Sequence, residues 1–270
     1  MPVDHTALTA LGERIGAQAW PGFLVLLAVL TAGTGLAAWG FEHLRRRHAA
    51  QPEPGARLLF GGLAVGLVAV LALAHAFAEV AEGLGNGRPM GLLDESISNA
   101  VGAHTPVAVR DMFMWLTHLG DPWFMGSLCV LVAALLWLRG HRGFAAGWLA
   151  ASVGNAVLNH VLKHIFERAR PIHEEGFALV SGFSFPSGHS SGSMVLYGML
   201  GYLGLRMLTP RWRVASVMAA TAVVITVACS RIFVRAHFPT DVLAGLCSGG
   251  AWLAICIASI EYARHHRRTR

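Results

Sequence analysis

A polar turn, Pro-Ser-Gly-His at residues 186–189, stands directly before an apolar run of the chain. If a helix begins here, Ser187 is its N-cap, Gly188 lets the backbone approach a ligand closely, and the free N–H groups of the first turn point outward with the positive end of the helix dipole. Such a helix end binds anions. The alternative is an ordinary turn with an interfacial histidine, which is the better interpretation for His189 taken alone, because the chain holds fourteen histidines.

Another polar cluster, SRIFVRAHFPTD, covers residues 230–241. Pro239 is typical of the first turn of a helix, so Asp241 falls in that turn and its carboxylate can reach back to the ring of His237. A carboxylate beside a histidine fixes the tautomer and stabilises the imidazolium, which prepares the other ring nitrogen to act as nucleophile or base. Asp241 could instead only complement the helix dipole, which is worth about 0.3–1 kcal/mol.

Three basic residues accompany these clusters. Lys163 is the only lysine of the chain, Arg170 follows it directly before Pro171, and Arg231 lies near the start of the cluster at residues 230–241. A single basic residue at the end of a membrane span usually just reaches to the interface. Three cations, the N–H groups near Ser187 and two histidines together fit phosphoryl transfer, in which one histidine attacks phosphorus and the other protonates the leaving oxygen.

The elements that must position these groups are membrane helices. Of the 270 residues, 54% are hydrophobic and only 13% are charged, which is too apolar for an ordinary soluble domain. Seven stretches lack any Asp, Glu, Lys or Arg, and at about 1.5 Å per helical residue each can cross, or nearly cross, a hydrocarbon core of roughly 30 Å. They are residues 20–41, 58–78, 122–138, 143–162, 189–205, 214–230 and 242–260. We therefore predict an all-α bundle of seven spans.

The distribution of arginine predicts the orientation of this bundle. The formal charge of +6 comes from arginines gathered in alternate loops, a pattern of membrane topology rather than of nucleic-acid binding. These residues are Arg45, Arg46, Arg47, Arg57, Arg139, Arg142, Arg206, Arg211, Arg213, Arg264, Arg267, Arg268 and Arg270. Because positive loops stay in the cytoplasm, we expect the C-terminus inside, the N-terminus outside, and the polar clusters facing a periplasm or the cell exterior.

Residues 79–121 lie on the same outer side and predict two short interfacial helices. One opens near Asp94 and the other follows Pro106, with Phe113 and Trp115 suited to the headgroup layer. Simple packing at the membrane surface and a role in admitting substrate both fit this pattern.

The three polar clusters, read as K-x6-R-P, P-S-G-H and S-R-x5-H-x3-D, resemble the complete signature of the type-2 phosphatidic acid phosphatase superfamily. Its members are integral-membrane lipid phosphatases that share an active-site architecture with soluble vanadium haloperoxidases. Every signature position is filled in the family's order and spacing, and the resemblance covers roughly residues 58–260, with six spans as in the family.

The resemblance implies a role for each residue. His237 attacks phosphorus and forms a phosphohistidine, Asp241 orients it, and His189 is the acid for the leaving group and then the base that activates water. The groups that hold the phosphate oxygens are Lys163, Arg170, Arg231 and the backbone of Ser187 and Gly188. No metal or other cofactor is implied, because three fixed cations do the work that magnesium does elsewhere.

The chain departs from the family's pattern in three places. Residues 1–57 add a span and a basic loop before the phosphatase domain of residues 58–270, and the first span lacks the features of a cleaved signal peptide. Arg235 could contact a second phosphate or simply face headgroups. Glu167 and Arg168 lie within the spacer of the K-x6-R-P cluster and could pair with each other, which is worth little at a surface.

The predicted function is removal of a terminal phosphate from a membrane lipid at the outer face of a bacterial inner membrane. Undecaprenyl diphosphate is the expected substrate, with phosphatidylglycerol phosphate and phosphatidate as alternatives. A further alternative is a phosphotransferase that passes the phosphoryl group from the same carrier lipid to lipid A, a reaction that differs from hydrolysis only in its acceptor. A transporter or scaffold would be expected to have lost a signature residue, and a haloperoxidase would be soluble. Beyond the bilayer and the substrate, no partner is predicted.

Overall fold

The computed structural model describes residues 5–48, 54–84, 88–171 and 182–268, and the regular structure in these ranges is entirely helical. The predicted all-α class is therefore confirmed. The helices are α1 (His5–Ala17), α2 (Ala19–His48), α3 (Pro54–Glu82), α4 (Pro89–His104), α5 (Val107–Leu116), the 3-10 turn η1 (Thr117–Gly120), α6 (Pro122–Leu138), α7 (Arg142–Phe166), α8 (Gly188–Met207), α9 (Pro210–Phe233) and α10 (Pro239–Arg268).

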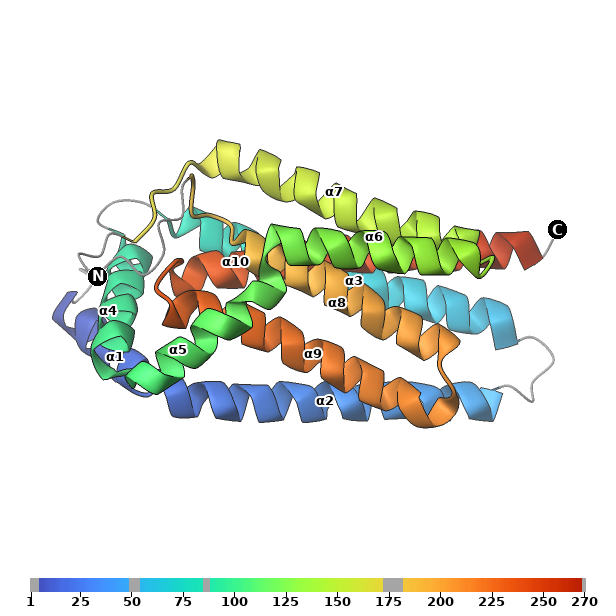
Figure 1. Cartoon of the computed structure of the whole chain (residues 1–270), viewed down its shortest axis with the longest axis horizontal. Coiled ribbons are helices and arrows are strands. Elements are labelled where there is room, and N and C mark those ends of the chain that lie inside the picture. Colours follow the sequence, from blue (N-terminus) through green and yellow to red (C-terminus); the bar gives the residue numbers. More distant parts are fainter. Residues whose placement is uncertain (1–4, 49–53, 85–87, 172–181, 269–270) are drawn as a thin grey trace.

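Each predicted span lies within one of the long helices, which run side by side along the long axis of the molecule (Figure 1). Within the described ranges, α2, α3, α9 and α10 are long and apolar enough to cross a membrane alone, and α6 qualifies together with α5, from which it bends by 43°. α7 and α8 carry more polar residues. α8 tolerates its serines because most of its residues are buried against other helices rather than exposed to lipid.

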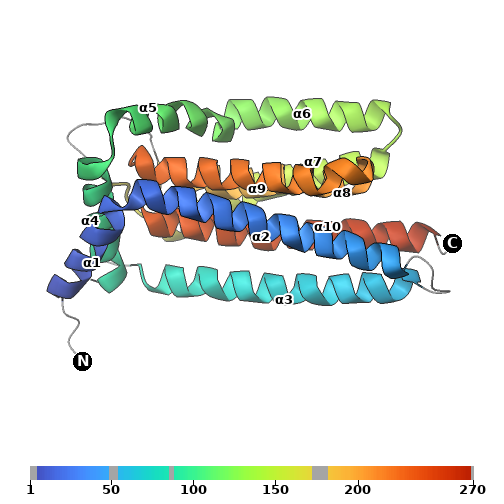
Figure 2. The same ribbon diagram turned by 90° about the horizontal axis from the view of Figure 1, so that it is seen from below.

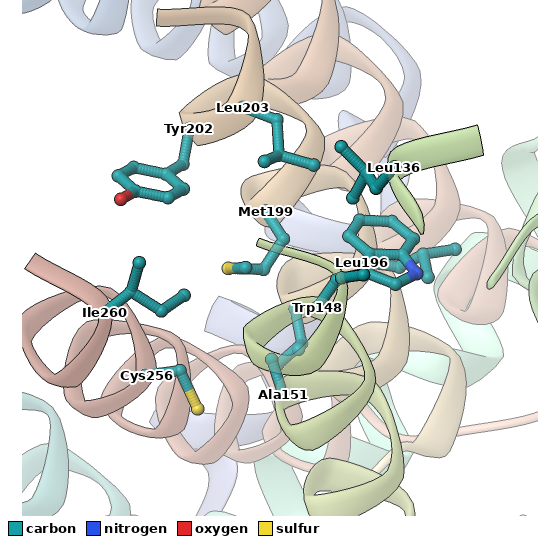
Figure 3. Close-up of a cluster of buried hydrophobic side chains, with 11 residues drawn as sticks. Leu136, Trp148, Ala151, Leu196, Met199, Tyr202, Leu203, Cys256 and Ile260 are labelled. Atoms are coloured by element: carbon teal, nitrogen blue, oxygen red, sulfur yellow. The ribbon is translucent and has the colours of Figure 1, made fainter. Parts of the chain in front are cut away.

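The main apolar core lies between α6, α7, α8 and α10. Trp148 of α7 and Met199 of α8 are fully buried at its centre, where Ile260 of α10 and Leu136 of α6 close around them (Figure 3). The indole N–H of Trp148 donates to the carbonyl of Cys129 at 2.9 Å, so this large ring leaves no polar group unpaired. This core fixes α8, whose N-terminus carries the Pro-Ser-Gly-His turn.

α8 and α10 approach each other closely because two glycines of α10 face α8. A Cβ atom at Gly245 would lie 2.6 Å from the carbonyl oxygen of Ser187, and one at Gly249 would lie 2.7 Å from that of Ser191. Real Cβ atoms do not come so close, so both positions need glycine. The first turn of α10 is thereby held against the first turn of α8.

One end of the bundle is covered by α4 and α1, which lie across it (Figures 1 and 2). α4 is the helix expected near Asp94, although it begins five residues earlier at Pro89. The expectation for Phe113 of α5 was wrong. Its ring is fully buried and stacks on Phe233 with centroids 4.2 Å apart, whereas Trp115 is exposed as expected. Phe113 is buried because α2, which is distant from α5 in the sequence, supplies Phe23 as a further aromatic partner.

The signature segments and the arginine-rich connections lie at opposite ends of the bundle. The C-terminus of α7, the N-terminus of α8, the C-terminus of α9 and the N-terminus of α10 all lie at the end covered by α4, and the C-terminus of the chain lies at the other (Figure 1). The arginine-rich connections lie at that other end, as the alternate-loop pattern predicts. The first long helix, α2, packs along α9, where Arg213 pairs with Glu42 at 3.0 Å.

Candidate active site

Backbone hydrogen bonds tie the three signature clusters together at the end of the bundle. The N–H of Ser187 donates to the carbonyl of Asp241 at 2.9 Å, which joins the second cluster to the third. The N–H of Ser184 donates to the carbonyl of Arg168 at 2.8 Å, which joins the approach to α8 to the first cluster. Stretches that are far apart in the sequence therefore meet around one small volume.

His237 is held in the turn between α9 and α10. Arg235, whose φ of 54° is left-handed, reverses the chain after α9, and the N–H groups of Ala236 and His237 donate to the carbonyl of Arg231 at 3.0 and 3.2 Å. Pro239 then begins α10, as predicted. The His237 side chain is 2% exposed, so the protein alone determines its hydrogen bonds.

The contacts of His237 define its tautomer. A terminal nitrogen of Arg170 lies 3.1 Å from Nε2 and can only donate, so Nε2 carries the lone pair. Nδ1 lies 3.4 Å from Oδ2 of Asp241, to which its proton points. Burial lowers the pKa of His237 from 6.5 to about 4, against the opposite effect of Asp241. The ring is therefore neutral at pH 7, with a free electron pair on the nitrogen that faces the cations.

His189 has a different carboxylate partner. Its Nε2 lies 3.1 Å from Oδ1 of Asp121, at the start of α6, and the second oxygen of Asp121 is 2.7 Å from Nδ1 of the exposed His118. Gly120 lets the ring lie close to the backbone, since a Cβ atom there would be 2.7 Å from His189. His189 follows Ser187 by two residues, and the N–H of Ser187 donates to the carbonyl of Asp241, so both predicted catalytic histidines lie where the first turns of α8 and α10 meet.

Ser187 caps α8, as predicted. Its hydroxyl accepts a hydrogen bond from the N–H of Ser190 at 3.4 Å and a second from the Ser190 hydroxyl at 3.0 Å. Gly188 is the first residue of the helix. The remaining N–H groups of this first turn have no partner within the helix, which is the property that makes a helix N-terminus an anion site.

The three predicted cations lie close enough to repel one another. Lys163 donates to the carbonyl of Phe183 at 2.6 Å, and Arg170 donates to the carbonyls of Phe183 at 3.2 Å and Ala236 at 2.9 Å. Arg231 donates to the hydroxyl of Thr117 at 2.7 Å, while its buried Nε has no hydrogen-bond partner in the described part of the chain. A buried donor without a partner beside two further cations is suited to a bound anion.

Sequence reasoning missed three residues at this end of the bundle. The pairing of Arg168 with Glu167 that the sequence allows is not the one the structure shows. Glu167 ends α7 with a left-handed φ of 44°, which directs Arg168 inward, where it contacts Asp94 and Asp241 at 2.7 Å each. The other two are Asp94 and Asp121. Each is distant in the sequence from the signature residues, or neighbours of signature residues, that it contacts, so only folding brings them together.

Arg235 does not point at the cations, since its guanidinium donates to the side-chain carbonyl of Asn99 on α4 at 3.0 Å. This hydrogen bond explains the position of Arg235 without either role considered for it, contact with a second phosphate or with lipid headgroups.

Asp94, one of the two carboxyl residues that sequence reasoning missed, is almost fully buried. Burial raises its pKa, and the hydrogen bonds from Thr240 and Arg168 counteract that shift.

The arrangement provides the parts of a phosphoryl-transfer site. A neutral imidazole presents its lone pair to a cluster of cations, a helix N-terminus adds N–H donors, and a second imidazole has a carboxylate partner. Such groups stabilise the charge of a phosphoryl group while a nucleophile attacks it. Fold and site together define a membrane phosphatase.

Comparison with known proteins agrees with this class. The model of the PAP2 superfamily matches residues 144–265. The chain is 31% identical to the lipid A 1-phosphatase of Rhizobium etli, over 61% of this chain and 76% of that protein. It is also 31% identical to phosphatidylglycerophosphatase B of Bacillus subtilis, over 58% of this chain and 77% of that protein.

A solved structure shows the same architecture. The crystal structure of a transmembrane PAP2-type phosphatidylglycerolphosphate phosphatase from Bacillus subtilis superimposes with a TM-score of 0.66 and 27% sequence identity, over 72% of this chain and 96% of that one. This protein belongs to the PAP2 superfamily. It is a multi-pass membrane phosphatase, as the three signature clusters predict.

Proposed function

We propose that this protein removes the phosphate of a lipid phosphate monoester at the outer face of a bacterial plasma membrane, through a phosphohistidine on His237 and without a metal ion. The contact between Arg170 and Nε2 of His237 carries this proposal. It leaves Nε2 as an acceptor nitrogen that faces a cation, which is the state that an attacking imidazole needs.

In the first step, Nε2 of His237 forms a bond to phosphorus while the bond from phosphorus to the lipid oxygen breaks. Lys163, Arg170, Arg231 and the first turn of α8 hold the phosphate oxygens, and Asp241 stabilises the positive ring. His189 acts as the acid in its doubly protonated form: its Nε2 proton stays hydrogen-bonded to Asp121, and its Nδ1 proton goes to the leaving lipid oxygen, which leaves a neutral ring for the second step. In the second step His189 takes a proton from water, the water oxygen attacks phosphorus, and orthophosphate leaves His237.

The relatives favour monoesters of membrane lipids as the substrate class. They are named for lipid A and for phosphatidylglycerol phosphate, and not for undecaprenyl diphosphate, which the sequence alone favoured. We therefore infer that phosphatidylglycerol phosphate is the preferred substrate, followed by the 1-phosphate of lipid A. Phosphatidate and undecaprenyl diphosphate are weaker substrates in this proposal.

An apolar groove supports a lipid substrate. It has a volume of about 310 Å³ and lies between α3, α7 and α10, where Leu73, Phe77, Leu158 and Trp252 are among the residues that line it. Leu162, which also lines the groove, directly precedes Lys163. A lipid chain in this groove would place its phosphate at the cations. We expect the KM for a long-chain lipid phosphate to be lower than that for its short-chain analogue.

The test is phosphate release by the purified protein from phosphatidylglycerol phosphate, lipid A, phosphatidate and undecaprenyl diphosphate, all with EDTA present. We expect turnover to persist in EDTA and to be lost in His237→Asn, whose amide can replace the Nδ1–H donor but has no nucleophilic nitrogen. Acid-labile, alkali-stable radiolabel on the wild-type protein after a rapid quench would mark the phosphohistidine. Strict dependence on magnesium, or full activity in His237→Asn, would contradict the proposal.

The same experiment separates hydrolysis from transfer to a second lipid. Mass spectrometry of the lipid products, with lipid A added to each phosphate donor, would reveal any new phosphorylated acceptor. We expect orthophosphate to account for all of the phosphate lost from the donor. A phosphorylated acceptor would instead identify a phosphotransferase.

A further inference from the structure

Arg168 lies between two buried carboxylates that belong to different helices. One terminal nitrogen, Nη2, donates to Oδ2 of Asp94 on α4, and the other, Nη1, donates to Oδ1 of Asp241 on α10, both at 2.7 Å. The side chains of Asp94 and Asp241 are 2% and 0% exposed, and that of Arg168 is 16% exposed. A guanidinium can satisfy two carboxylates at once because its donors point in fixed, divergent directions.

Thr240 and Phe238 complete this cluster. The Thr240 hydroxyl hydrogen-bonds to Asp94 and accepts from Nη1 of Arg168 at 2.7 Å, and the Thr240 N–H donates to Oδ1 of Asp94 at 3.2 Å. The ring of Phe238 covers the guanidinium, with its centroid 4.5 Å from the central carbon. Charged groups are costly to bury unless every one of them has partners, so the cluster is stable only when it is complete.

The cluster reaches the nucleophile through one carboxylate. Oδ2 of Asp241 faces Nδ1 of His237 and accepts from the N–H of Phe238 at 3.0 Å, which leaves Oδ1 to Arg168. Both oxygens are therefore assigned, and the carboxylate cannot rotate without breaking a buried hydrogen bond. A fixed, ionised carboxylate keeps the His237 proton on Nδ1 and the lone pair on Nε2.

We propose that Arg168 and Asp94, which lie outside the signature positions, are positioning residues for the nucleophile: they hold the Asp241 carboxylate in the orientation that fixes the reactive tautomer of His237. This inference rests on the proposed phosphohistidine mechanism. Neither residue touches the substrate, and both act only through Asp241. α4 therefore contributes to catalysis, in addition to covering the end of the bundle.

Kinetic measurements on Arg168→Met, Arg168→Lys and Asp94→Asn test the proposal. We expect kcat to fall roughly 10- to 100-fold, as for other residues that orient a reacting group through its partner, and KM to change little. Arg168→Lys keeps the charge but cannot span both carboxylates, so it should recover only a minor part of the loss. Arg168→Lys and Asp94→Asn also keep the proposal testable if Arg168→Met does not fold.

Arg235→Met is the matched control. Arg235 also ties the turn after α9 to α4, through Asn99, but it makes no hydrogen bond or ion pair with Asp241 among those the structure shows. If Arg168 only anchored α4, the loss of either arginine would lower activity similarly. We expect the kcat of Arg235→Met to stay within about twofold of wild type, because substitutions away from a buried charge cluster usually have small effects. A loss equal to that of Arg168→Met would overturn the proposal.

The decisive comparison repeats the substitutions in an Asp241→Asn background. Residues that act as one unit are strongly non-additive, so we expect Arg168→Lys and Asp94→Asn to lower kcat by less than about threefold there. Equal losses in both backgrounds, or no loss in wild type, would show that neither residue acts through Asp241.

A spectroscopic measurement separates this inference from the proposed function. The Nδ1 proton of His237, hydrogen-bonded to a buried carboxylate, should give a downfield resonance in the NMR spectrum of histidine-labelled protein. We expect the resonance to shift or broaden in Arg168→Lys and Asp94→Asn and to stay in place in Arg235→Met. An unchanged resonance in all variants would overturn the positioning role. Absence of wild-type turnover on every lipid would overturn the proposed function without affecting this result.

Discussion

His237 has a hydrogen-bond partner at each ring nitrogen and almost no contact with solvent. Burial opposes a positive charge on the ring, and Asp241 favours one. The first effect is larger, so the imidazole is neutral at pH 7. In the proposed mechanism the carboxylate stabilises the ring only once attack on phosphorus has made it positive, which is the order of events that a nucleophile requires.

The titration of His237 gives a first prediction. Because its pKa is lowered from 6.5 to about 4, the folded protein should keep this ring neutral down to about pH 4. Between those two values the unfolded chain binds a proton that the folded chain does not, so the stability contributed by this group is lost as the pH falls. NMR titration of histidine-labelled protein, with His237→Asn to identify the signal, measures the pKa. A midpoint near 6.5 would contradict the prediction.

Asp121 gives a second prediction at the residue scale. If it orients His189 as the acid, Asp121→Asn should slow hydrolysis of a lipid phosphate about 10- to 100-fold, within the range that a general acid contributes. Hydrolysis of p-nitrophenyl phosphate, whose leaving group needs no proton, should slow much less. His189→Ala should show the same selectivity with a larger loss. Equal losses on both substrates would exclude this role.

His118→Ala provides the control for Asp121. His118 contacts the other oxygen of the same carboxylate, and its side chain is 62% exposed. Its removal should therefore leave the selectivity between the two leaving groups unchanged. A selectivity like that of Asp121→Asn would instead place His118 in the path of the proton.

At the scale of the elements, the contact between α8 and α10 decides whether the second and third clusters meet. Gly245 faces the carbonyl of Ser187, which is also the residue whose N–H binds Asp241. The two helix starts therefore share one contact surface. A shift between these helices changes the distance between the N-terminus of α8 and His237.

Gly245→Ala tests this contact. We expect a loss of roughly 1–3 kcal/mol in the free energy of unfolding, the usual cost of overpacking, together with a clear loss of turnover. Gly126→Ala on α6 is the control, because a Cβ atom there meets nothing within 4 Å. It should be neutral or slightly stabilising. Thermal unfolding in detergent and phosphate release measure both effects, and similar behaviour of the two variants would refute the prediction.

The sequence predicted those features of the site that depend on local spacing. The cap at Ser187, the first turn of α10 at Pro239 and the pairing of His237 with Asp241 involve residues at most four positions apart. The contacts that it could not predict join distant residues: Arg168 lies 74 positions from Asp94, and His189 lies 68 positions from Asp121. No local periodicity carries such information. Phe113 was misplaced for the same reason, since its burial depends on α2 and α9.

For the whole molecule, the separation of charges between the two ends remains the basis of the predicted orientation. The arginine-rich end should face the cytoplasm, and the catalytic end should face the periplasm or the exterior. Green fluorescent protein fused after residue 270 should fluoresce, and an alkaline phosphatase reporter at that position should be inactive. In the loop after α3, the alkaline phosphatase reporter should be active. The reverse pattern would place the site inside the cell and contradict the proposed function.

The contact between Arg170 and His237 has a consequence for the resting protein. The guanidinium lies against the electron pair of Nε2, the atom that the proposed mechanism assigns as the nucleophile. In that mechanism an incoming phosphate competes for the same guanidinium, so the negative charge of the substrate would expose the atom that reacts with it.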